Sequence, residues 1–146
     1  MTFPSKPGAG IELSQDQRIA WLRLSRSEKV GPATFIELIK RYGTAARALA
    51  ELPDLARRSS RGAISIPSVE AAEAELHQIA KMGGHTVCLG EPAYPAALRA
   101  TDSPPPVLTV LGNLDSITGN NVAIVGSRNA SLSGVKFARE LAGDLG

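Results

Sequence analysis

A short polar turn behind an apolar run holds the residues of this sequence that could do chemistry. The run is "VAIVG", residues 122–126, and the turn contains Gly126, Ser127 and Arg128. α/β proteins often bind phosphate where a buried strand ends in glycine and a helix begins, because the first N–H groups of a helix have no partner within it. Arg128 adds a fixed charge that can donate two hydrogen bonds to one phosphate. The turn therefore predicts a phosphate site.

The turn matches neither of the two common nucleotide-binding loops. Arg128 stands where a dinucleotide fingerprint has the glycine that lets a pyrophosphate approach, and the Gly-Lys pair of a P-loop is absent. A single phosphodiester fits better. The candidate contacts are Gly126, Ser127, Arg128, Asn129, Ser131 and Gly134. The alternative is that Ser131 or Ser133 only caps the helix and that Arg128 is an ordinary surface arginine.

A second possible phosphate contact lies in "EKVGPATFIELIKRYG", residues 28–43. This stretch resembles the hairpin of a helix-hairpin-helix element. Gly31 would allow a sharp turn, and the N–H groups of the next helix would face a DNA phosphate with Lys29 nearby. The alternative is an ordinary turn between two helices.

The elements that would position these turns begin with helices. The first helix is predicted to begin after Ser14, which forms a capping box with Gln17 three residues later. The second lies between Pro32 and Gly43. A third helix ends at Pro53, and Ser68 caps a fourth. After Gly84 the pattern changes to short β-rich runs at 85–90, 107–112 and 122–126. The continuous apolar run at 122–126 is typical of a parallel sheet buried on both faces.

These elements predict an α/β protein. Residues 1–13 form a flexible tail, residues 14–82 a helical domain, and residues 83–146 the first part of a parallel-sheet domain. A final helix, "SGVKFARELAGDL", would cover the sheet with Val135, Ala138, Leu141, Ala142 and Leu145. Sixty-four residues are few for such a domain, so we expect it to be incomplete at Gly146 and the chain to be part of a longer protein.

The composition of the chain excludes several classes of protein. With 146 residues, 43% apolar and 21% charged, the chain is typical of a globular protein. Cys88 is the single cysteine, which excludes an internal disulfide and indicates a reducing cytoplasm. No metal-ligand spacing, secretory signal or membrane span is present, so we expect no metal, no cofactor and no membrane. Residues 1–81 hold 12 Lys/Arg and 9 Asp/Glu, a weak sign of a polyanionic partner.

Three stretches together resemble the bacterial DNA-processing protein A family, DprA or Smf. They are "VGPATFIELIKRYGTAARAL", "YPAALRATDSPPPVLTVLGNL" and "VAIVGSRNASLSGVKFARELA". The resemblance covers Arg18 to Gly146 and implies a SAM-like, helix-hairpin-helix domain followed by a Rossmann-like one. It gives Gly126, Ser127 and Arg128 a role in a DNA-phosphate pocket. Family members often have Tyr-Gly at the helix start, where this chain has Ser133-Gly134.

The resemblance implies a protein without catalytic activity. It would bind and protect single-stranded DNA and load the RecA recombinase during natural transformation, in the cytoplasm and as a homodimer when full-length. Its RecA and dimer surfaces would lie beyond Gly146. The alternatives are an enzyme of the nucleotide phosphoribohydrolase kind, which shares a Rossmann-like fold, and a helix-hairpin-helix module that binds duplex DNA.

Overall fold

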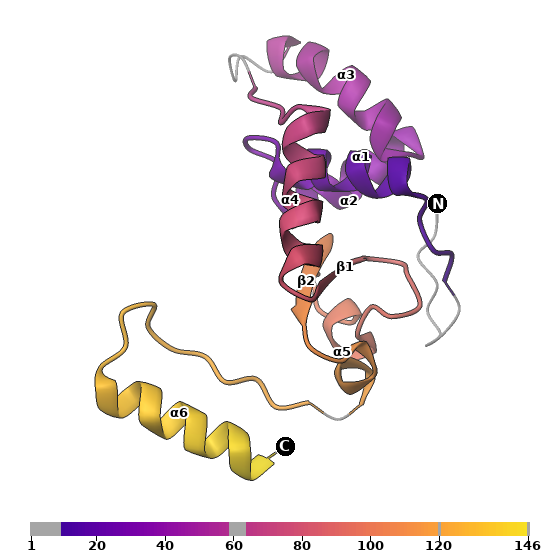
Figure 1. Ribbon diagram of the computed structural model, residues 1–146. Coiled ribbons are helices and arrows are strands. Elements are labelled where there is room, and N and C mark those ends of the chain that lie inside the picture. The colour runs from indigo at the N-terminus through magenta and orange to yellow at the C-terminus, as the bar shows by residue number, and fades with distance from the viewer. Residues whose placement is uncertain (1–9, 59–63, 120, 146) are drawn as a thin grey trace.

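The computed structural model describes residues 10–58, 64–119 and 121–145. The elements are α1 (Gln15–Arg26), α2 (Pro32–Tyr42), α3 (Ala45–Arg58), α4 (Val69–Lys81), β1 (Gly84–Cys88), α5 (Ala96–Arg99), β2 (Val107–Leu111), the 3-10 helix η1 (Leu114–Thr118) and α6 (Leu132–Leu145). Figure 1 shows α1 to α4 packed together beside the two strands, while α6 stands apart after an extended stretch of chain.

The predicted helix ends of α1, α2 and α4 are confirmed. Ser14 and Gln17 make both hydrogen bonds of the capping box, with N···O distances of 3.3 and 2.8 Å. Pro32 is the first residue of α2, and Gly43 follows its end at a φ of 80°, which glycine adopts without strain. The Ser68 hydroxyl accepts a hydrogen bond at the start of α4. These helix boundaries follow from local chemistry alone.

The predicted end of α3 at Pro53 is wrong, because the helix continues to Arg58. Proline removes one hydrogen bond and strains the preceding turn. Leu52 and Ala56 lie on either side of it and are both buried. The apolar face that these residues continue stabilises the helix more than the proline weakens it.

The sheet differs from the parallel one that was predicted. β1 and β2 lie at the expected places but pair antiparallel, with Gly84 opposite Leu111 and Cys88 opposite Val107. A parallel pair needs a long crossover, usually through a helix. Within the described chain, the only α-helix between these two strands is the four-residue α5. The chain therefore turns back, and β2 runs in the direction opposite to β1.

The predicted strand at 122–126 does not form. Val122, Ile124 and Val125 are 68%, 43% and 90% exposed, and this segment pairs with no strand of the described chain. A strand is stable only when a neighbour takes its N–H and C=O groups. α6 forms as predicted, starting one residue earlier, but it buries no residue, so the apolar side that was expected to cover a sheet faces solvent here.

One apolar core joins the helices to the strand pair. Trp21 packs on Phe35 with ring centroids 4.9 Å apart. The same cluster of buried residues takes in Val87, Cys88 and Tyr94 from the region of the strands. The helical half and residues 84–111 therefore fold around common packing. None of the described helices is long and apolar enough to cross a membrane.

Candidate nucleic-acid interface

The turn before α6 is organised by serine hydroxyls. Ser127 Oγ accepts a hydrogen bond from the backbone N–H of Asn129 at 3.2 Å. Ser131 Oγ accepts one from the N–H of Gly134, also at 3.2 Å, and lies 3.3 Å from the Ser133 hydroxyl. Ser131 is thus the N-cap of α6, as one interpretation of this turn predicted. A cap and an anion site are compatible, because a helix start has several N–H groups to satisfy.

The N–H groups next to this cap face solvent. The backbone oxygen of Ser131 accepts a hydrogen bond from the N–H of Val135 at 3.0 Å, and the Ser131 hydroxyl accepts one from the N–H of Gly134. The intervening Leu132 and Ser133 are exposed, and no hydrogen bond within the described chain uses their N–H groups. The positive end of the α6 dipole therefore lies open to an anion.

Arg128 provides the fixed charge at the turn. It is exposed, and none of the ion pairs formed within residues 10–58, 64–119 and 121–145 involves it. By contrast, Lys136 on α6 lies 3.7 Å from Glu140, one helical turn away. Arg128 can thus meet a phosphate without first leaving a carboxylate.

Gly126 is not held in a conformation that requires glycine. Its φ is not among the positive values, and a Cβ added there would meet no atom within 4 Å. The turn in this structure therefore accommodates glycine without needing it. A requirement for glycine at this position would come from the close approach of a ligand to the backbone.

The hairpin between α1 and α2 also differs in detail from the prediction. The sharp turn is made by Lys29, at a φ of 63°, while Gly31 has an extended backbone with φ −81° and ψ 176°. Lys29 Nζ lies 3.7 Å from Glu28 Oε1. Gly31 offers no side chain to cap α2. Lys29 lies three residues before Pro32, where α2 starts, so a phosphate contact would draw on neighbouring residues of the chain.

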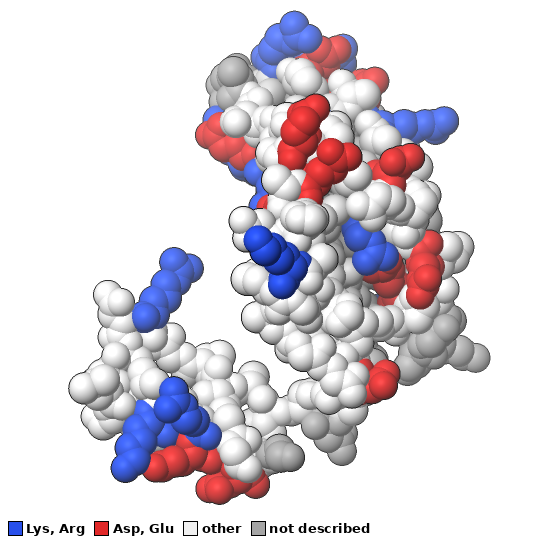
Figure 2. Space-filling view, viewed as in Figure 1, with Lys and Arg blue, Asp and Glu red and all other residues white. Residues whose placement is uncertain are grey.

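The structure does not bring the two candidate phosphate sites together. α2 belongs to the packed helices, and α6 lies away from them (Figure 1). Charges of both signs are spread over the helical part in Figure 2, and no broad basic face appears in that view. Phosphate recognition would therefore depend on individual turns rather than on a wide electrostatic surface.

The sequence did not reveal a polar cluster around Glu91, which lines a cavity together with Arg18 and Leu13. Glu91, whose side chain is 5% exposed, accepts hydrogen bonds from Arg18 at 2.6 Å and from the N–H groups of Leu13 at 3.1 Å and Cys88 at 2.6 Å. Arg18 and Leu13 are 73 and 78 residues away from Glu91 in the chain, so no local sequence pattern could predict these two contacts. The described residues form no cluster of three or more potential metal ligands.

Two family models match consecutive parts of the chain. Residues 15–77 match the DprA-like N-terminal HHH domain. Residues 85–146 match the DNA recombination-mediator protein A model, which includes the turn at 126–134. A comparison with curated proteins found no match.

Proposed function

The chain belongs to the DNA recombination-mediator protein A (DprA) family, and from this premise we propose that it binds single-stranded DNA without catalysing a reaction. In this proposal it protects incoming DNA and loads RecA onto it during natural transformation. The family assignment supports a role in recombination, and the turn before α6 supports the contact with DNA.

The observation that carries the proposal is the exposed turn at residues 127–134. It combines an arginine free of ion pairs in the described chain with unused N–H groups at the start of a 14-residue helix. Such a site suits one backbone phosphate. Phosphate contacts hold a strand without reading its bases, as a protein that coats incoming DNA of any sequence requires.

We also propose that residues 122–126 and α6 begin a Rossmann-like parallel sheet. The apolar segment is exposed to solvent, and so is the apolar side of α6, including Val135 and Leu145. When a neighbouring strand pairs with 122–126, that side of α6 can cover the sheet. The turn would then lie at the carboxyl end of a strand, where open α/β sheets bind ligands.

The helical domain offers a second contact in the same proposal. Lys29 and the start of α2 after Gly31 can meet a phosphate, as in helix-hairpin-helix elements. A cytoplasmic location, a homodimer and a RecA contact follow from the family resemblance and are part of the proposal.

Two measurements separate this function from its alternatives. Fluorescence anisotropy should show tighter binding of a labelled single strand than of a duplex of the same sequence, whereas a duplex-binding module would reverse that order. Calorimetric titration should show no micromolar binding of NAD or ATP, because Arg128 obstructs the approach of a pyrophosphate and no P-loop lysine is present. Micromolar binding of either nucleotide would contradict the mediator and favour the enzyme.

A further inference from the structure

A cavity of about 720 Å³ lies where the helices meet the strands. Five parts of the chain line it, with a contribution from Leu114: the segment that leads into α1, the start of α1, one side of α4, β1, and the loop after β1. Its volume is that of sites which bind small ligands or peptide side chains, and such sites are common at domain junctions. The two family matches also meet here, since they end at residue 77 and begin at residue 85.

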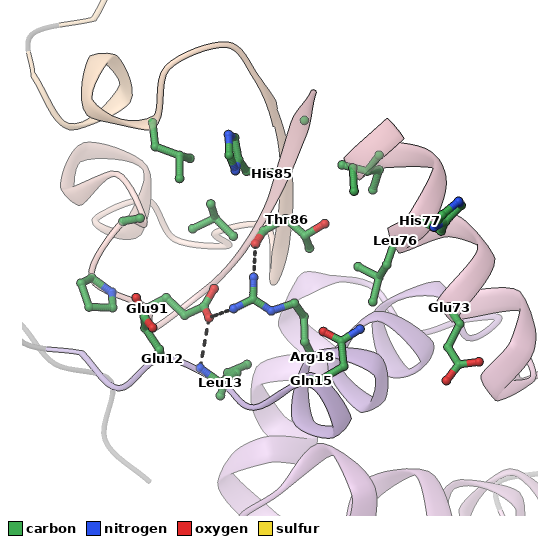
Figure 3. Close-up of a pocket in the computed structure, with 17 residues that line it drawn as sticks. Glu12, Leu13, Gln15, Arg18, Glu73, Leu76, His77, His85, Thr86 and Glu91 are labelled. Carbon is green, nitrogen blue, oxygen red and sulfur yellow. Dashed lines mark hydrogen bonds and ion pairs between the residues drawn. The ribbon is translucent and has the colours of Figure 1, made fainter. Parts of the chain in front are cut away.

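The cavity is already formed and held by buried hydrogen bonds. Arg18 donates hydrogen bonds to Glu91 at 2.6 Å and to the carbonyl of Thr86 at 2.5 Å. Glu91 also accepts hydrogen bonds from the N–H groups of Leu13 and Cys88. These contacts fix the start of α1 to β1 and to the loop that follows it (Figure 3). A ligand would therefore not have to order the walls, which favours binding.

The lining combines apolar side chains with unbalanced negative charge. Its apolar members include Leu13, Leu76, Ile79, Val87, Pro92 and Leu114. Arg18 and Glu91 neutralise each other, whereas Glu12 and Glu73 are exposed and make no ion pair with any described residue. Figure 3 shows these two glutamates on opposite sides of Arg18. The cavity is thus a groove that combines polar and apolar side chains, with an exposed carboxylate on each side of Arg18.

We propose that this groove, formed by the residues that line the 720 Å³ cavity, binds a segment of a partner protein in which basic residues flank aliphatic ones. The aliphatic side chains would bury apolar surface against Leu76, Ile79 and Leu114. The two basic side chains would meet Glu12 and Glu73, while their methylene stems add to the apolar contact. The groove does not include Arg128, so this partner and DNA bind at separate places.

The test uses the 146-residue chain and the peptide acetyl-Lys-Leu-Leu-Lys-amide, followed by ¹⁵N NMR. Titration should shift the amide signals of the groove, such as those of Leu76, His77 and His85, and leave those of α2 unchanged. The matched peptide acetyl-Glu-Leu-Leu-Glu-amide should cause no such shifts. If neither peptide shifts these signals at millimolar concentration, or if both do so equally, the proposal is wrong.

Variants then test separately the two carboxylates and the space inside the groove. Glu12→Gln and Glu73→Gln should each weaken the basic peptide between about two-fold and five-fold, the usual range for exposed ion pairs. Glu51→Gln, at an exposed position on α3, is the matched control and should bind unchanged. Ala80→Trp should fill the groove and abolish binding, whereas Ala74→Trp, also exposed on α4 but outside the lining, should not. Equal binding by Ala80→Trp and Ala74→Trp would overturn the assignment of the groove.

Discussion

At the scale of single residues, Arg128 is the side chain on which the proposed DNA contact depends most. Arg128→Ala should weaken single-stranded DNA binding about tenfold, the effect of losing hydrogen bonds to a charged group. The slope of log affinity against log salt should fall in magnitude by about 0.7, since one phosphate contact releases one counterion. Arg128→Lys should restore only part of the affinity, because an ammonium lacks the planar fork. Anisotropy at several salt concentrations measures both quantities.

The control for this experiment is Arg47→Ala, which removes an exposed arginine from α3, far along the chain from the turn. It should leave affinity and salt slope unchanged. The effect of Arg128→Ala should also be similar for oligonucleotides of different sequence, because phosphate contacts do not read bases. A folded Arg128→Ala protein with normal affinity and salt slope would show that the turn serves only to cap α6.

Two buried groups predict a loss of stability at high pH. Burial raises the pKa of the Cys88 thiol from 9.0 to about 12, with a smaller contribution from the Glu91 carboxylate. Burial also raises the pKa of the Tyr94 hydroxyl from 10.0 to about 12. Both groups are neutral when protonated, so the folded chain holds its protons to higher pH than the unfolded chain. The stabilisation is complete below about pH 9 and is lost as the pH rises through about 12.

Denaturation followed by Trp21 fluorescence at pH 8, 10 and 11 tests this dependence. The free energy of unfolding should fall between pH 9 and pH 12, by at most about 1.4 kcal/mol per pH unit for each group. Tyr94→Phe should reduce the slope above pH 10, although it also removes the hydrogen bond to the carbonyl of Pro105. A free energy of unfolding that stays constant from pH 8 to pH 11 would contradict the buried positions of both groups.

At the scale of elements, the sequence predicted helices better than sheet pairing because helix ends depend on near neighbours. Ser14 with Gln17, and Pro32 with Gly43, act within a few residues of each other, and the structure has these ends where they were predicted. Pro53 was misread because its effect is outweighed by burial of α3 against α1, a contact between distant parts of the chain.

Strand direction and pairing depend on distant partners in the same way. The apolar runs at 85–90 and 107–112 marked two strands, but their composition does not distinguish antiparallel from parallel pairing. The run at 122–126 has the composition of a buried strand and no strand beside it in this structure. The turn at 126–134 could be proposed as a site because glycine, serine and arginine carry local chemistry. Glu91 instead joins Arg18 and Leu13, which are far from it in sequence.

The segment 122–145 should therefore exchange its backbone hydrogens rapidly in this chain. α6 has 14 residues and none of them is buried, and isolated helices of that length are marginally stable in water. Hydrogen exchange of residues 122–145 should be much faster than that of α1, whose Leu22 and Leu24 are almost fully buried. The amides of α1 are the internal control. Strong protection throughout 122–145 would show that this segment is already packed on a neighbour.

At the scale of the whole molecule, the helices and the strand pair depend on each other for stability. The buried cluster contains Trp21 and Phe35 from the helices together with Val87 and Tyr94. Either part alone would gain little stability, because small domains bury a low fraction of their surface. The Arg18–Glu91 pair joins the same two parts through polar contacts. We therefore expect the two parts to unfold together.

Glu91→Ala tests this coupling most directly. The substitution removes the acceptor of Arg18 and of the N–H groups of Leu13 and Cys88, which lie on both sides of the junction. It should lower the free energy of unfolding by about 3 kcal/mol, as expected when one partner of a buried ion pair is lost. Guanidinium denaturation followed by Trp21 fluorescence should show one transition at lower denaturant, coincident with that seen by circular dichroism.

The matched variants separate the lost contacts from a general effect of removing a carboxylate. Glu91→Gln keeps an oxygen that can accept one of these hydrogen bonds, so it should destabilise the chain less than Glu91→Ala. Glu37→Ala, on the exposed side of α2, should change the free energy of unfolding by less than about 0.5 kcal/mol. If Glu91→Ala left the Trp21 transition unchanged while the strands lost their structure separately, the helices would not need the strands, and the single shared core would not describe how the molecule folds.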